Sequence, residues 1–597
     1  MPFRRTIALA AATTLCLIPA PASAHAPVAA REPTATGYGG AVSTVDPIAT
    51  AVGLGVLRRG GNAVDAAVAA AATLGVTEPF SAGIGGGGFF VYYNARKHKV
   101  YTIDGRESGP ASMTADWFID PATGTPYSSV EARVSGLSVG TPGTLATWES
   151  AVRKWGTRSL GSLLRPAARV AENGFAVDAT FRQQVTDNAA IFGQFEATSD
   201  LYLPGGVPPE VGSIQRNPDL AETYRLIARN GTDVFYRGAI ARDIVRTVQD
   251  PPVAEDPIGD WAPPIRGADL RLSDLKHYRV RFRDPTRSDY RGLTVYGMST
   301  PSSGGTAVGE ALNILETTNL SEVDLTQALH RYLEATALSF ADRNRYVGAY
   351  TRQRVLKRLI SDRWAAQRAC QISPTRALTK PVPPGDINAT GCTSALVGAT
   401  VDAGQSTTNL TVSDKWGNVV EYTLTIEATG GSGMVVPGRG FLLNNELTDF
   451  NFSPAPGNNW DTDPNLPGPT KRPRSSMSPT IVLKDGKPFL ALGSPGGASI
   501  ITTVVQVLIN RLDLGMTLPE AVAAPRASQR NSPGIQAEAA FRLRYGPALT
   551  ALGHTFGMDA AELGAATAIE FGPLGLVTAV AEPARRGGGA AAVEFPL

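Results

Sequence analysis

The alternation of apolar and polar residues is most regular between residues 407 and 427. Residues 407–413 and 419–427 are rich in Thr, Val, Leu, Ile and Tyr, and the intervening segment 414–418 holds turn-forming residues. This pattern predicts a β-hairpin. If its turn centres on Trp416, Thr407 faces Thr425, because each lies nine residues from the centre (416 − 407 = 425 − 416 = 9). One face of the hairpin then carries both hydroxyls.

Other stretches show the period of helices or strands. Helices are expected over 47–59, 63–74, 144–155, 160–173, 219–230, 325–344, 499–513 and 518–524. Strands are expected over 40–46, 89–93, 290–298, 481–483 and 489–493. Asn62 is a plausible N-cap, and the helix after it is almost all Ala and Val, so it should be buried. Arg585 to Gly589 are expected to begin a loose C-terminal tail.

The glycine run 83–88 is not a nucleotide-binding loop. It lacks the Lys-Ser/Thr of a P-loop, and it leads into the predicted strand 89–93 rather than into a helix. Close backbone packing is its expected role.

The N-terminus resembles an export signal. Arg4 and Arg5 precede an apolar run over 7–18, and Ala22-Ser23-Ala24 fits a cleavage site, so residues 1–24 are predicted to be a signal peptide. Its removal takes away two arginines and lowers the formal charge from +2 to 0. Without a basic patch or stripe, nothing indicates nucleic-acid binding. The protein is expected to be secreted or periplasmic, with no membrane span after signal removal.

Two cysteines, Cys370 and Cys392, remain in the mature chain. An even pair in an exported protein favours a disulfide, and the alternative is two free thiols. The bridge would lie within a connector, residues 369–405, that is rich in Pro, Gly, Thr and Ala.

Thr407 raises a question of chemistry. A threonine hydroxyl is a weak nucleophile until a base takes its proton, and a free α-amine on the same residue can be that base. This requires a chain break between Ser406 and Thr407, and the small, polar residues 401–406 suit an exposed, cleavable loop. The alternative is an ordinary surface hairpin with threonines on its wet face.

Several blocks in order resemble γ-glutamyltransferases (γ-glutamyl transpeptidases), which belong to the N-terminal-nucleophile hydrolases. These blocks are Thr407-Thr408-Asn409-Leu410-Thr411-Val412, residues 440–450, Arg472-Pro473-Arg474-Ser475-Ser476-Met477 with 478–480, and Gly493-Ser494-Pro495-Gly496-Gly497. The resemblance implies an α/β protein with a four-layer αββα sandwich. It also implies self-cleavage into a large subunit, 25–406, and a small subunit, 407–597, which together form one domain.

The resemblance also implies roles for individual residues. Thr407 would be the nucleophile, Thr425 its hydrogen-bond partner, and the N–H groups of Gly496 and Gly497 an oxyanion hole. Arg106, Ser475 and Ser476 would hold the α-carboxylate of a γ-glutamyl substrate, and Glu446 and Asp449 its ammonium. Trp460, in the loop 449–471, stands where some family members carry an aromatic lid; the alternative is an exposed loop tryptophan.

Two positions depart from the family pattern. Asn409 stands where many members have histidine, and Glu427 where many have asparagine. Glu427 is expected to share a strand face with Thr425 and to be a third carboxylate beside the ammonium. The alternative is a solvated glutamate at the end of a strand.

No cofactor is implied. The sequence has no metal-binding His or Cys spacing and no dinucleotide fingerprint, and its five histidines (25, 98, 277, 330 and 554) lie in no recognisable motif, so no metal site is predicted.

The expected function is γ-glutamyl transfer from glutathione and related compounds, through a γ-glutamyl-Thr407 ester, to water or to an amino-acid or peptide acceptor. The alternatives are a related acylase, acting on cephalosporins, glutaryl groups or poly-γ-glutamate, and a non-catalytic exported binding protein.

Overall fold

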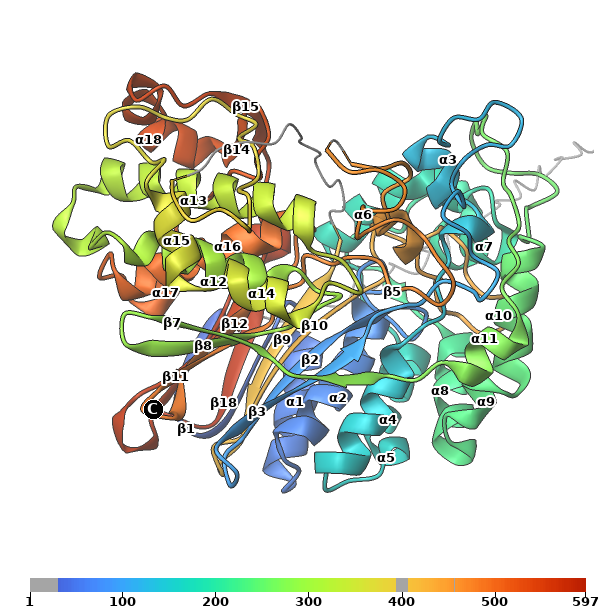
Figure 1. Cartoon of the computed structure of the whole chain (residues 1–597). Coiled ribbons are helices and arrows are strands. Elements are labelled where there is room, and N and C mark those ends of the chain that lie inside the picture. The colour runs from blue at the N-terminus through green and yellow to red at the C-terminus, as the bar shows by residue number, and fades with distance from the viewer. Residues whose placement is uncertain (1–30, 393–405, 456) are drawn as a thin grey trace, which may run out of the picture.

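The computed structural model describes residues 31–392, 406–455 and 457–597. The predicted signal peptide and most of the segment ahead of Ser406 lie outside these residues. Thirteen strands of the described chain form one large sheet (Figure 1). They are β1 (Thr34–Thr44), β2 (Gly87–Asn94), β3 (Lys99–Gly105), β6 (Arg281–Arg283), β7 (Thr286–Tyr290), β8 (Leu293–Gly297), β9 (Thr408–Ser413), β10 (Val419–Thr425), β11 (Thr480–Lys484), β12 (Lys487–Gly493), β16 (Thr567–Phe571), β17 (Val577–Ala581) and β18 (Ala590–Pro596).

The sheet folds over on itself. Its strand order is β6-β3-β2-β10-β9-β1-β17-β16-β12-β11-β8-β7, with β18 paired to β1. Strands β9 and β10 of the first half also pack against β12 and β16 of the second. Side-chain hydrogen bonds cross between these layers: Asn409 Nδ2 donates to Thr567 Oγ1 over 2.8 Å. The two halves therefore form the inner two layers of a sandwich.

Helices form the outer layers (Figure 1). Phe90 and Tyr92 of β2 join the core beneath the first helical layer, whereas Phe89, Val91 and Tyr93 join the core on the other face. This alternation is that of a strand buried on both faces. The predicted four-layer αββα arrangement is confirmed.

All eight predicted helices are present, and the described residues form ten further α-helices that were not predicted. Together, these helices are α1 (Pro47–Arg58), α2 (Ala63–Thr77), α3 (Ser129–Arg133), α4 (Thr144–Trp155), α5 (Leu160–Asn173), α6 (Ala179–Phe192), α7 (Glu196–Tyr202), α8 (Pro218–Asn230), α9 (Asp233–Tyr236), α10 (Ala239–Gln249), α11 (Leu272–His277), α12 (Gly304–Glu316), α13 (Leu325–Tyr346), α14 (Gln353–Leu359), α15 (Asp362–Ala369), α16 (Ser499–Leu512), α17 (Leu518–Ala523) and α18 (Ala539–Ala551). Asn62 caps α2 in a capping box with Asp65, and every residue of α2 is buried, as predicted.

Two small sheets complete the secondary structure. One pairs β4 (Phe175–Ala176) with β5 (Ile214–Gln215), and the other joins β13 (Ala527–Ser528), β14 (Ile535–Glu538) and β15 (Phe556–Ala560). No helix within 31–392, 406–455 and 457–597 is long and apolar enough to cross a bilayer.

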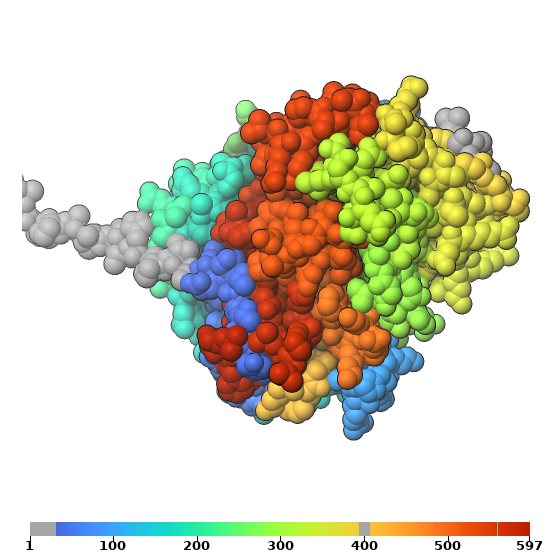
Figure 2. All heavy atoms as spheres, turned by 90° about the vertical axis from the view of Figure 1, so that its left-hand side faces the viewer, coloured from blue at the N-terminus to red at the C-terminus, as the bar shows by residue number. Residues whose placement is uncertain are grey.

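The C-terminal segment is not a loose tail, so that prediction was wrong. Residues 590–596 form β18, which pairs antiparallel with β1 from Thr44↔Ala590 to Gly37↔Pro596. Figure 2 shows the result: the N-terminal (blue) and C-terminal (red) parts of the chain meet on one face. The sequence shows only Arg and Gly before a short apolar run, and the partner strand lies at the opposite end of the chain.

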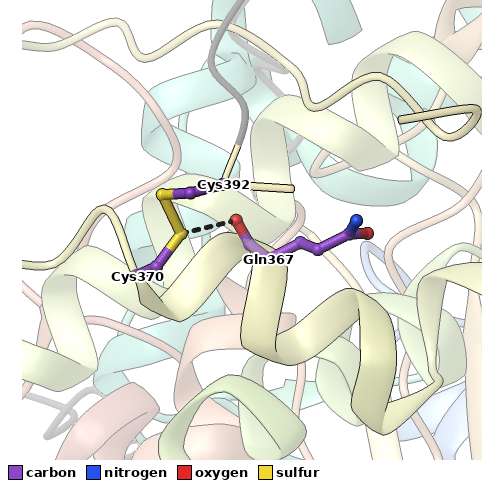
Figure 3. The surroundings of a disulfide bond; sticks show 3 residues. All are labelled: Gln367, Cys370 and Cys392. Atoms are coloured by element: carbon purple, nitrogen blue, oxygen red, sulfur yellow. Dashed lines mark hydrogen bonds between the residues drawn. A yellow bond between two sulfur atoms is a disulfide. The ribbon is translucent and has the colours of Figure 1, made fainter. Parts of the chain in front are cut away.

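The predicted disulfide is present. Cys370, which follows α15, is bonded to Cys392, and their Cα atoms are 6.0 Å apart (Figure 3). Cys370 Sγ also lies 3.1 Å from the Gln367 carbonyl oxygen. The bridge closes a loop of 22 residues that lies wholly before Ser406.

Candidate active site

The hairpin of β9 and β10 sits in the middle of the sheet, where it places Thr407. The pairing runs from Thr408↔Leu424 to Ser413↔Val419, so the predicted register is confirmed. Thr407, just before β9, and Thr425, at the end of β10, are both buried, and their hydroxyl oxygens are 3.3 Å apart. A surface hairpin with threonines on its wet face is thereby excluded.

Thr407 is in contact with its own preceding peptide. Its hydroxyl donates to the Ser406 carbonyl oxygen as well as to Thr425. Gly86, just ahead of β2, lets the backbone pack closely at the end of β10, because a Cβ on it would collide with the Thr425 carbonyl oxygen. The predicted role of the glycine run in backbone packing is confirmed.

A cavity of about 30 Å³, enough for one or two water molecules, adjoins Thr407. It brings together most of the predicted site residues, which come from six separate segments of the chain. Its lining includes Arg106, Ser406, Thr407, Thr425, Glu427, Glu446, Asp449, Ser475, Ser476 and Gly497. Arg474, Met477, Ala498 and Ile500 complete the lining and were not predicted.

Arg106 is the central cation of this cavity. It follows β3 and is 1% exposed. Its guanidinium forms ion pairs with both Glu446 and Asp449, and it donates to the Pro473 and Arg474 carbonyl oxygens at 3.2 and 3.1 Å. The predicted carboxylate clamp and the predicted ammonium ligands are thus bonded to each other.

Burial raises the pKa of three carboxyl groups near Arg106. Burial, followed by the charges of Asp449 and Glu446, raises the pKa of Glu427 to about 8. Burial also raises the pKa of Glu446 well above its usual range. Glu107 lies behind them, fully buried, and burial raises its pKa to about 7. Too many carboxylates share one guanidinium for all to be ionised together.

Glu427 reaches the cavity differently from the prediction. Strand β10 ends at Thr425, and Glu427 has a left-handed backbone with φ of 79°. It therefore does not share a strand face with Thr425, and that prediction was wrong. A turn instead directs its carboxylate to Asn445 Nδ2, and its N–H donates to Thr425 Oγ1 over 2.8 Å.

Gly496 and Gly497 form the turn between β12 and α16. Their φ angles of 129° and 56° favour glycine. They lie just ahead of α16, where unpaired backbone N–H groups and the helix dipole favour negative charge. Gly497 lines the cavity, whereas Gly496, the residue before it in the chain, is not part of the lining.

Ser475 and Ser476 line the cavity and have partners within the protein, whereas Asn409 and Trp460 lie outside the lining. Ser476 Oγ accepts from Arg343 over 2.7 Å, and Ser475 Oγ from the Met477 N–H over 3.2 Å. Asn409 points between the sheet layers, where its amide donates to Glu421 over 2.5 Å. Trp460 is 49% exposed and is not part of the cavity lining.

A cluster that sequence reasoning missed lies on the other side of Thr407. Arg586 donates to the Thr407 carbonyl oxygen over 2.6 Å, to Glu78 over 2.9 Å and to Ser81 Oγ over 2.6 Å. The Ser406 hydroxyl lies 2.9 Å from Ser81 Oγ and 3.1 Å from the Phe80 carbonyl oxygen. Burial raises the pKa of Glu78 to about 7. Local sequence gave no signal, since these groups are about 500 residues apart along the chain.

Two of the five scattered histidines also meet. His330, Glu334 and His554 are buried with ligand-type atoms within 4.8 Å of one another. However, His330 Nδ1 lies 2.7 Å from His554 Nε2, His330 Nε2 lies 2.7 Å from the Ser373 carbonyl oxygen, and Lys380 is ion-paired with Glu334. The donor atoms are already engaged, and the Lys380 ammonium would repel a metal ion, so these residues fit a hydrogen-bond network better than a metal site.

A family model and two known proteins match most of this chain. The family model described as gamma-glutamyltranspeptidase matches residues 49–592. The glutathione hydrolase proenzyme of Bacillus subtilis (strain 168) is 37% identical over 542 residues, covering 88% of this chain and 87% of that protein. The acylase ACY 1 proenzyme of Pseudomonas sp. (strain V22) is 32% identical over 571 residues, covering 94% and 95%.

A solved structure also superposes on the fold. The cephalosporin acylase from Bacillus halodurans covers 96% of this chain and 99% of its own, with a TM-score of 0.79 and 27% identity. The family match spans the β9–β10 hairpin, the acidic cluster and the diglycine turn together. The chain belongs to the gamma-glutamyltranspeptidase family.

Proposed function

We propose that this protein is a self-processing γ-glutamyltransferase and hydrolase that acts on glutathione and related γ-glutamyl compounds. The observation that carries the proposal is the position of the Thr407 hydroxyl. It contacts the Ser406 carbonyl and opens onto a cavity lined by two arginines and three acids. The name glutathione hydrolase proenzyme, borne by relatives over most of the chain, supports the same activity.

The first step is self-cleavage. Thr407 Oγ attacks the Ser406 carbonyl carbon, the Ser406–Thr407 peptide bond breaks, and an ester joins Ser406 to Oγ. Water then hydrolyses this ester, leaving a carboxylate on Ser406 and a free α-amine on Thr407. The products are the proposed large subunit, 25–406, and the proposed small subunit, 407–597.

The same hydroxyl then serves turnover. The Thr407 α-amine takes the proton of Oγ as it attacks the γ-carbonyl of the substrate. The N–H groups of Gly496 and Gly497 stabilise the oxyanion, and the departing amine takes the proton. The resulting γ-glutamyl ester is released by water or by an amino-acid or peptide acceptor. Thr425 orients Oγ through its hydroxyl.

Recognition of the donor substrate would use the ion pairs that Arg106 forms with Glu446 and Asp449. The α-carboxylate would bind Arg106, Ser475 and Ser476, and the α-ammonium would bind Glu446 and Asp449. Arg106 and the two acids bond to each other in the structure. A substrate that carries both an α-carboxylate and an α-ammonium can take the place of the acids at Arg106 and of Arg106 at the acids. A substrate with one charge would leave a buried ion unpaired, which is costly. We further propose export by the predicted signal, and a lid role for Trp460.

A specific observation supports a second candidate. The acylase ACY 1 proenzyme and the cephalosporin acylase both match nearly the whole chain. An acylase acting on glutaryl groups would not need acids for an α-ammonium. Assaying γ-glutamyl and glutaryl anilides side by side on purified protein separates the two, with faster γ-glutamyl turnover expected.

Processing is tested by replacing the nucleophile. The wild-type protein should give two chains on a denaturing gel, and N-terminal sequencing of the smaller should begin Thr-Thr-Asn-Leu. Thr407→Ala should remain one chain, because no hydroxyl can attack Ser406. Cleavage of Thr407→Ala at the same bond would refute self-processing, and an uncut wild-type chain would favour a binding protein.

A further inference from the structure

Arg343 lies behind the cavity, on the side of Ser476. It belongs to the last turn of α13 and is 2% exposed. Its guanidinium donates from three nitrogens: Nε to Ser303 Oγ over 2.8 Å, Nη1 to Asn344 Oδ1 over 2.8 Å and Nη2 to Ser476 Oγ over 2.7 Å. Arg343 is not part of the cavity lining, and no step proposed above uses it.

The contact with Arg343 decides how the Ser476 hydroxyl can act. A guanidinium carries N–H donors and no acceptor, so Ser476 Oγ must accept this bond. The hydroxyl hydrogen of Ser476 then remains for a second partner. Ser475 is in the same state, because its Oγ accepts from the Met477 N–H over 3.2 Å. In the described part of the chain, no group accepts a hydrogen bond from either serine hydroxyl.

Both serines line the cavity beside Arg106. Two hydroxyl hydrogens and one guanidinium therefore adjoin the same small space. A carboxylate only accepts hydrogen bonds, so it fits these groups better than an amide or a hydroxyl, which would bring donors of its own. The proposed function places the α-carboxylate of the γ-glutamyl donor here.

Arg343 also holds the backbone that carries these serines. Ser303 Oγ, which accepts from Arg343, donates to the Ser475 carbonyl oxygen over 2.7 Å. The Ser303 N–H donates to the same oxygen over 2.8 Å. Ser303 immediately precedes α12, so one buried guanidinium connects α13, the start of α12 and the serine pair. The direction of the Ser476 hydroxyl and the position of Ser475 thus depend on the same side chain.

We propose that Arg343 is a positioning residue for the donor substrate: by donating to Ser476 Oγ, it directs the Ser476 hydroxyl hydrogen to the substrate α-carboxylate. The inference rests on the proposed function and deepens it. Arg343 itself does not touch the substrate, although its positive charge beside Ser476 also favours an anion in the cavity. The chemical steps at Thr407 need nothing from Arg343, so its loss should weaken donor binding rather than slow bond breaking.

The test compares two donors that differ by one group. γ-Glutamyl anilide carries the α-carboxylate, and 4-aminobutyryl anilide is the same donor without it. We would measure kcat/KM for both donors with the processed wild-type protein, with Arg343→Met, with Ser476→Ala and with the double variant. Methionine keeps a long, unbranched side chain in the buried space but removes the charge and every hydrogen-bond donor.

Arg343→Met should lower kcat/KM for γ-glutamyl anilide about tenfold, as expected for the loss of one hydrogen bond to a charged group. The loss should appear in KM, with kcat nearly unchanged. The value of kcat/KM for 4-aminobutyryl anilide should not change. Ser476→Ala should show the same pattern, and adding Arg343→Met to it should cost little more, because two residues that act through one hydrogen bond are not additive.

Arg291→Met is the matched control. Arg291 lies in the turn between β7 and β8, is partly buried, and bonds Asp513 and the Thr318 carbonyl oxygen. This variant removes a guanidinium away from the cavity and should leave both kcat/KM values unchanged. If Arg343→Met does not fold or process, Arg343→Lys serves instead. Lysine keeps the charge but loses the planar fork, so it should show a smaller loss, confined to γ-glutamyl anilide.

Failure of this inference can be told from failure of the proposed function. A wild-type protein that releases no aniline from γ-glutamyl anilide overturns both. An enzyme that turns this donor over, but in which Arg343→Met lowers kcat/KM equally for both donors or for neither, overturns the positioning role alone. A tenfold loss that persists in the Ser476→Ala background does so too, and this comparison decides where 4-aminobutyryl anilide reacts too slowly to measure.

Discussion

Arg106 shows how one residue can prepare a site for a doubly charged ligand. Burial would ordinarily penalise its charge, but the negative charges of Glu446 and Asp449 compensate for it. The acids in turn depend on Arg106, since without it they would repel one another. A ligand that brings one carboxylate and one ammonium exchanges these bonds without leaving any buried charge unpaired.

Arg106→Lys should therefore cost more than a charge-conserving change usually does. Lysine keeps the charge but cannot bond two carboxylates in parallel. We therefore expect kcat/KM for a γ-glutamyl anilide to fall by an amount that corresponds to about 2–4 kcal/mol of lost transition-state stabilisation. Arg287→Lys, at an exposed arginine of β7, is the matched control. A folded, self-cleaved Arg106→Lys enzyme with near-normal kcat/KM would rule out the clamp.

Glu427 should make the proposed ammonium pocket more acidic than asparagine would. Its pKa of about 8 leaves it largely protonated at neutral pH, and a bound ammonium should favour the ionised form. Donor binding near pH 7 should therefore release protons, measurable by calorimetry in buffers of different ionisation enthalpy. Glu427→Asn should abolish much of this release.

The same variant should relax substrate choice. We expect the ratio of kcat/KM for γ-glutamyl over glutaryl anilide to fall about tenfold in Glu427→Asn, or about 1.4 kcal/mol. The carboxylate that favours the α-ammonium is then gone, while Glu446 and Asp449 remain. An unchanged ratio would mean that Glu427 does not contribute to selectivity.

At the scale of elements, local signals located most of the framework. The helices 144–155 and 160–173 were predicted to the residue, because each has a regular apolar face and glycine follows at 156 and 174. The register of the β9–β10 hairpin followed from its turn, and that register places Thr407 opposite Thr425. Short-range patterns fix such elements.

Elements that depend on distant partners could not be predicted in this way. Strand β18 needs β1 to pair with, and Arg586 matters because it meets Glu78 and Ser81. Glu427 lies only two residues past β10, yet a left-handed turn redirects it. The family resemblance supplied the donor-side residues, but nothing in the sequence marked the cluster behind Ser406.

The disulfide is a stabilising element within one proposed subunit. Replacing both Cys370 and Cys392 by serine should lower the free energy of unfolding by about 3 kcal/mol, the value the chain-entropy model gives for a loop of this size. Denaturant titration of the unreduced proteins measures this, with reduced wild type as the control. Because the loop lies before Ser406, a non-reducing gel should still separate the two processed chains; one disulfide-linked band would contradict this assignment.

At the scale of the whole molecule, the two proposed subunits are interleaved rather than side by side. Strand β9 of the proposed small subunit pairs with β1 of the proposed large one, and β10 pairs with β2. The His330–His554 contact adds a further link, because His330 and Ser373 precede the cleavage point and His554 follows it. The two proposed subunits should therefore remain associated after cleavage.

This histidine link should make the assembly sensitive to acid. Burial, followed by the neighbouring His330 and Lys380 charges, lowers the pKa of His554 to about 3, against 6.5 for a free histidine. The charged groups facing the pair are Glu334, Lys380 and Arg331. A depressed folded-state pKa contributes stability above pH 6.5 that is lost progressively as the pH falls towards 3, because the unfolded chain binds the proton more readily.

Between pH 7 and pH 4.5 the loss from this site should be about 2 kcal/mol. His554→Gln can still donate to His330 but cannot titrate, so the Tm of the variant should fall less over this range than that of wild type. His277→Gln, at an exposed histidine at the end of α11, should follow wild type. Equal acid sensitivity of His554→Gln and wild type would mean that other groups, and not this link between the proposed subunits, set the acid limit.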